Sequence, residues 1–126
     1  MSMDIDIWAA EPFDLPAQLP GPQNWNVYEV PIPKLGTVKN YAYESDGWQV
    51  LVTLGELRKR TPPDSVRSLD GFGAHVAGVS LEPISADDSG YAMLEETVRA
   101  LARATNGRWI DPLNGTAHDA EAGSFD

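Results

Sequence analysis

The segment Ser85–Pro112, SADDSGYAMLEETVRALARATNGRWIDP, decides the fold because it contains the signals for a helix and for both of its ends. The residues that recur at spacings of three and four share one helix face: Tyr91, Leu94, Val98, Leu101 and Thr105. Side-chain oxygens of Ser85, Asp87, Asp88 and Ser89 precede them and suit the unpaired N–H groups of a first turn. Asn106-Gly107 predicts the end of the helix, because glycine adopts the left-handed backbone of a C-terminal cap at no steric cost.

Downstream of the helix, Arg108–Ile110 predicts a short strand that ends at Asp111-Pro112. Residues 114–126 are small, acidic and glycine-containing, with Phe125 as their one large apolar side chain. This composition predicts a flexible tail that contributes little to stability.

Upstream, residues 37–54 carry the clearest β pattern of the chain. Asp46-Gly47 is a dipeptide preferred in type I′ turns, which join two strands through a two-residue loop. The expected cross-strand pairs are Ser45 with Trp48, Tyr43 with Val50, and Tyr41 with Val52. The alternation of apolar and polar residues selects the same register, so we expect a hairpin whose Val50 and Val52 face the helix.

Two further segments, Asp4–Trp8 and His75–Leu81, also read as strands. Residues 11–36 hold six of the ten prolines, which predicts a proline-rich arm and confines its extended part, near Trp25–Val30, to a sheet edge. Residues 56–72 form a polar connector in which Thr61–Leu69 suggests a short helix. The expected fold class is α+β: one domain over residues 1–126, with an antiparallel sheet of four or five strands and one long helix on one face.

Composition limits the classes of partner. The chain has 126 residues, no cysteine, and a net charge of −10 from nineteen acidic and nine basic residues. This charge repels nucleic acid and anionic membranes and attracts a basic protein, although it also simply favours solubility. A signal peptide and a membrane-spanning run are not expected, so the expected location is the cytoplasm.

No catalytic, nucleotide-binding or cofactor motif is present, and no metal site is expected. His118-Asp119-Ala120-Glu121 offers metal-ligating side chains, but its place in the predicted tail favours a solvated segment. An alternative site for a small ligand or an enzyme would lie between the sheet and the proline-rich arm. Its candidate residues are Asp70, His75, Arg58 and Arg60.

The candidate protein-binding residues lie in the arm and in the first strand. Trp25 is flanked by the amides of Asn24 and Asn26, so it either pins the arm to the sheet or stays exposed as a binding anchor. Alternation places Asp4 and Asp6 on the solvent side of their strand, where they form a polar face.

The run Leu101–Pro112, LARATNGRWIDP, is similar to the end of several small bacterial domains. Some of those resemble immunity proteins of polymorphic toxin systems. The resemblance covers the last third of the chain and implies a protein that binds and neutralises a cognate toxin in the cytoplasm. The sequence therefore favours a non-enzymatic binding protein. The alternative is a small enzyme or a ligand-binding domain.

Overall fold

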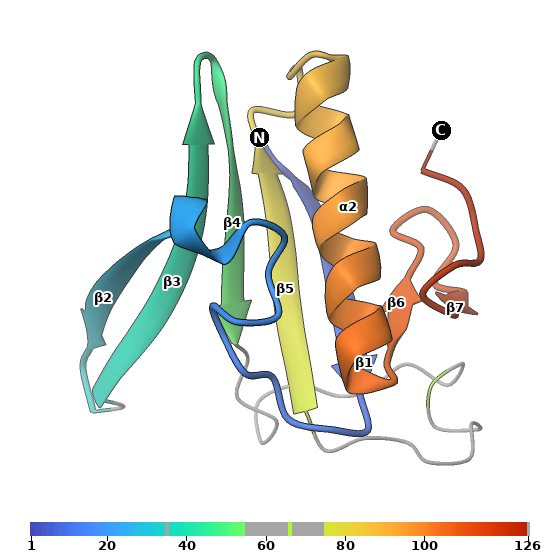
Figure 1. Cartoon of the computed structure of the whole chain (residues 1–126), viewed down its shortest axis with the longest axis horizontal. Coiled ribbons are helices and arrows are strands. Elements are labelled where there is room, and N and C mark those ends of the chain that lie inside the picture. Colours follow the sequence, from blue (N-terminus) through green and yellow to red (C-terminus); the bar gives the residue numbers. More distant parts are fainter. Residues whose placement is uncertain (35, 55–65, 67–74, 126) are drawn as a thin grey trace.

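A computed structural model describes residues 1–34, 36–54, 66 and 75–125 of the chain (Figure 1). The described residues form one antiparallel sheet with strand order β2-β3-β4-β5-β1-β6-β7, and the helix α2 packs on it. The elements are β1 (Met3–Ala9), η1 (Pro22–Asn24), β2 (Asn26–Ile32), β3 (Gly36–Ser45), β4 (Trp48–Leu54), β5 (His75–Glu82), α2 (Asp88–Thr105), β6 (Arg108–Ile110) and β7 (Ala117–His118). The α+β class is confirmed. The sheet has seven strands where four or five were expected, and β7 lies in the segment interpreted as a flexible tail.

The helix begins and ends where its sequence signals predict. The Asp87 carboxylate accepts hydrogen bonds from the backbone N–H groups of Ser89 and Gly90, at 3.1 and 3.2 Å. At the other end, the left-handed residue is Asn106, with φ 53°, and not Gly107 as expected. Gly107 is needed for space instead, because a Cβ atom there would lie 2.9 Å from the carbonyl oxygen of Trp8 in β1.

One face of the sheet holds the main hydrophobic core. The helix buries Leu94, Val98 and Leu101, as the periodicity predicted, and contacts β1, β4, β5 and β6 (Figure 1). Their fully buried partners on the strands include Val50 and Val52, so the hairpin and the helix share one core, as expected.

The arm covers the same face of the sheet beside the helix. Its extent is residues 10–25, because the following residues of the predicted arm form β2. Figure 1 shows it crossing from the end of β1 toward β3, next to α2. Leu19 and Trp25 of the arm are buried in the same cluster as the helix residues. The space between the arm and the sheet is therefore filled by side chains.

The hairpin register is confirmed in all three expected pairs, Ser45 with Trp48, Tyr43 with Val50, and Tyr41 with Val52. The turn type is not the expected one. Only Gly47, with φ 84°, has a positive φ in the loop, whereas a type I′ turn needs this at both central residues. The register is unchanged because the loop still has two residues.

The proline-containing strand β2 lies at one edge of the sheet, as expected. Hydrogen-bonded and non-hydrogen-bonded pairs alternate along an antiparallel ladder. Counting from Ser45 and Trp48, which close the two-residue loop, Pro31 and Thr37 form a non-hydrogen-bonded pair. The backbone nitrogen of Pro31 therefore faces the free edge of the sheet, and its lack of an N–H removes no hydrogen bond between β2 and β3.

The structure describes only part of the connector between β4 and β5. The short helix expected over Thr61–Leu69 lies outside the described residues apart from Val66, which packs against Trp8 and Val76. Within the described ranges, no helix has both the length and the apolar character that crossing a membrane requires.

We predict that Val98→Asp lowers the free energy of unfolding by about 4 kcal/mol or more, because Val98 is fully buried and the carboxylate would have no partner. Ala92→Asp, at an exposed position on the same helix, is the matched control and should change stability by less than about 1 kcal/mol. Urea denaturation followed by circular dichroism measures both. Equal stability of the two variants would contradict this packing of α2.

Candidate functional site

The sheet face opposite the helix carries a small apolar cluster around Trp8 and Val76 and, beside it, a polar region. This polar region carries most of the chemistry that the structure offers to a partner. Ile5 and Ile7 of β1 are buried on the helix side, so alternation turns Asp4 and Asp6 to the other side. Asp4 is exposed there, as the sequence predicted for this strand.

The strand register aligns three rows of side chains across this second face. The first row contains Glu44, Gln49 and Glu82; the second contains Asn26, Ala42, Leu51, Ser80 and Asp4; the third contains Tyr28, Asn40, Thr53, Gly78 and Asp6. We call these three rows the acidic face. They include four carboxylates and no lysine, arginine or histidine. The charged side chains of these three rows are therefore all acidic.

Neutral donors hold the carboxylates in place. Glu44 accepts a 2.5 Å hydrogen bond from the Tyr28 hydroxyl and a 3.1 Å hydrogen bond from the Asn26 amide. These two bonds lower the pKa of Glu44, the one from Tyr28 having the larger effect, so the carboxylate stays ionised.

The same pattern of neutral donors continues across the next strands. Gln49 donates to Glu82 at 3.1 Å, and the Ser80 hydroxyl donates to Asp4 at 2.6 Å. Hydrogen bonds from neutral donors thus hold Glu44, Glu82 and Asp4 in place.

A hollow of about 670 Å³ adjoins the first row of the acidic face. Glu44, Gln49 and Glu82 line it on the sheet side, and Met1 and Trp48 contribute apolar surface. Two carboxylates that flank an amide, beside an indole ring, suit the guanidinium or ammonium group of a partner's side chain.

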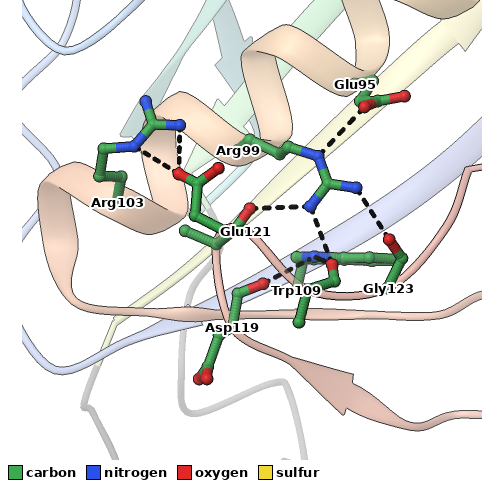
Figure 2. Close-up of polar contacts among 9 residues, drawn as sticks. Glu95, Arg99, Arg103, Trp109, Asp119, Glu121 and Gly123 are labelled. Carbon is green, nitrogen blue, oxygen red and sulfur yellow. Dashed lines mark hydrogen bonds and ion pairs between the residues drawn. The ribbon is translucent and has the colours of Figure 1, made fainter.

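The described arginines are occupied within the chain. Figure 2 shows Arg99 reaching from α2 to the C-terminal segment. Its guanidinium donates to Glu95 and to the backbone carbonyls of Ala120, Ala122 and Gly123, at 2.8–3.2 Å. It also lies 4.9 Å from the centre of the Phe125 ring. With four hydrogen bonds, Arg99 is a structural residue and not a site for an anion.

Two more arginines fasten the same segment. Arg103 pairs with Glu121, and Arg108 pairs with Asp119 at 2.7 Å. Trp109 donates its indole N–H to the carbonyls of Asp119 and Ala122 (Figure 2). The expectation of a flexible tail over residues 114–126 does not hold for its described part, up to Phe125, because that part is fixed by charged hydrogen bonds that come from the helix and from β6.

These contacts give each potential metal-ligating side chain of the tail a different partner. His118 lies against the Trp109 ring, with centroids 4.6 Å apart, while Asp119 and Glu121 pair with different arginines. Across the described ranges, no three histidine, aspartate or glutamate side chains gather in a way that could hold a metal ion.

Trp25 is not the exposed anchor that one sequence interpretation proposed. Its side chain is 6% exposed, and its indole N–H donates to the carbonyl oxygen of Pro20 at 2.8 Å. It pins the arm to the sheet, which was the other interpretation. Of its neighbours, Asn24 is exposed in η1, while Asn26 belongs to the acidic face together with Asp4 and Asp6.

The residues of the alternative ligand site are not brought together in the described part of the chain. Asp70, Arg58 and Arg60 lie outside the described residues. His75 is half-buried at the start of β5, opposite Ala9.

Sequence reasoning missed Glu44, Gln49 and Glu82 as site residues. The expected hairpin pairs imply that Glu44 and Gln49 also lie opposite one another, and this was the available signal. Glu82 joins them only because β5 pairs with β4, which no local pattern predicts.

We predict that Arg99→Ala destabilises the protein by about 2–3 kcal/mol, because it removes several charged hydrogen bonds at a side chain that is 15% exposed. Arg103→Ala is the matched control, since that side chain is 60% exposed, and it should cost less than about 1 kcal/mol. Hydrogen exchange of residues 119–123 should speed up only in the Arg99 variant. Similar protection in both variants would contradict the role of Arg99.

Comparisons of this chain with protein-family models, with curated proteins and with solved structures find no match.

Proposed function

We propose that this chain is a non-enzymatic binding protein whose acidic face occludes a basic partner protein. In its most specific form, the proposal is an immunity-type protein that neutralises a cognate toxin in the cytoplasm. The observation that carries the proposal is the acidic face itself: four carboxylates on three rows of one sheet face, without a basic side chain among them.

The distribution of charge supports the choice of a basic partner. The described part of the chain contains fifteen acidic and five basic residues, so it carries the full net charge of −10. Arg99, Arg103 and Arg108 are three of those five, and each pairs with an acidic side chain. The remaining field attracts a cationic surface and repels nucleic acid and anionic lipid.

The rigidity of the acidic face supports occlusion. Its side chains stand on paired strands and are joined by hydrogen bonds across them, so little side-chain freedom is lost on binding. Tyr28 adds an aromatic ring that is 48% exposed, and Val30, which is 41% exposed, follows it on the same side of β2. Tyr28 takes the place of Trp25 as the proposed aromatic anchor.

The alternative function, a small enzyme or ligand binder with a site between the sheet and the arm, has less support. Leu19 and Trp25 are both buried in that space, at 3% and 6% exposure.

We predict that Glu44→Gln with Glu82→Gln slows association with the partner about threefold to tenfold at low salt, because steering depends on these charges. The matched control is Glu11→Gln with Glu96→Gln, which removes the same charge from exposed positions outside the acidic face. The partner is the protein that co-purifies with the wild-type chain from its native host. Stopped-flow measurement between low and physiological salt gives the association rates.

The two double variants separate specific recognition from net charge. If both slow association equally, only the overall charge matters and the acidic face is not the interface. If neither rate depends on salt, the electrostatic mechanism is wrong.

We predict that Tyr28→Ala raises the dissociation rate of the same complex about tenfold or more, as the loss of a desolvated aromatic anchor does. Tyr28→Phe is the control, because it keeps the ring and removes only the hydroxyl that bonds Glu44. An unchanged dissociation rate in the alanine variant would exclude Tyr28 as the anchor.

A further inference from the structure

A second concave site lies on the helix side of the sheet, away from the acidic face. It is a cavity of about 280 Å³ between α2, β1, β6 and the C-terminal segment. Its apolar walls are Met3, Ile5, Tyr91, Leu94, Trp109 and Phe125. Three of these six are aromatic, so the cavity offers ring surfaces and aliphatic side chains to a ligand.

Asp111 is the one acidic residue among the described residues that line this apolar cavity. Its Oδ1 atom accepts a 2.8 Å hydrogen bond from the backbone N–H of Leu113, and its Oδ2 atom lies 4.0 Å from Nε2 of His118. The side chain is 18% exposed. A carboxylate accepts up to about four hydrogen bonds, so this group has capacity for a further donor.

We propose that this cavity binds a small molecule that combines an apolar ring with a protonated amine. The volume suits one or two rings, since a cavity of about 150 Å³ already accepts benzene. The amine would form a charge-assisted hydrogen bond with Asp111, which is stronger than a neutral one. Among the described residues that line the cavity there is no lysine or arginine.

The C-terminal segment forms one wall of the site. Phe125 stacks on Trp109, with ring centroids 4.5 Å apart, and Ser124 lines the cavity beside it. Arg99 is one of the residues that hold this wall on the helix. A bound ligand would therefore contact both the core and the C-terminal segment and would stabilise their association.

Nuclear magnetic resonance titration of the full chain tests the proposal with two matched probes, 2-phenylethylamine and 2-phenylethanol. Both carry the same ring, and only the first is a cation. The amine should shift the amide resonances of Tyr91, Leu94 and Leu113 saturably and bind about tenfold more tightly than the alcohol. Asp111→Asn should reduce the affinity for the amine to that for the alcohol and leave the alcohol unaffected. Glu96→Gln, a carboxylate outside the cavity, should change neither affinity.

Three results would overturn the proposal. The first is that neither probe gives saturable shifts at the cavity residues. The second is that Asp111→Asn leaves the affinity for the amine unchanged or weakens both probes equally, which would make Asp111 a structural residue only. The third is that the amine shifts resonances of Glu44 and Glu82 and not those of the cavity. None of these results bears on the binding of a protein by the acidic face.

Discussion

The burial of one face of α2 against the sheet is the constraint on which the rest of this structure depends. Leu94, Val98 and Leu101 need an apolar surface, and β1, β4 and β5 provide it with alternate residues such as Ile7 and Val50. The arm then covers what the helix leaves open on that side. Because strand side chains alternate, the burial of one face against α2 turns every second residue of these strands to the opposite side. The acidic face is thus a direct consequence of where the helix packs.

Most of the fold could be predicted from the sequence because its signals are local. The ends of α2, the hairpin register and the edge position of the proline-containing strand each follow from a few neighbouring residues. The acidic face could not be predicted from the sequence in the same way. Asp4 and Ser80 are 76 positions apart and meet only because β1 pairs with β5. Periodicity indicates which side of a strand is polar, but not which strands lie next to one another.

The C-terminal segment shows how composition can mislead. Residues 114–125 contain few large apolar side chains, and that predicted disorder. They are fixed instead through their backbone carbonyls, three of which accept hydrogen bonds from Arg99. Every residue type has a backbone carbonyl, so the amino-acid composition of the segment could not predict this interaction. The arginine lies in the helix, about twenty residues earlier, so no local pattern in the segment points to it.

The two edges of the sheet have unequal capacity for further strand pairing. At one edge β7 has only two residues, which is too short to template another strand. At the other, β2 has seven residues, with Val27, Tyr28 and Val30 exposed. Pro31 interrupts the row of N–H donors along this edge, a feature that natural proteins use against edge-to-edge aggregation. An edge strand that exposes apolar residues carries a risk of fibrous self-assembly, and Pro31 lowers this risk because it removes one N–H donor from the edge.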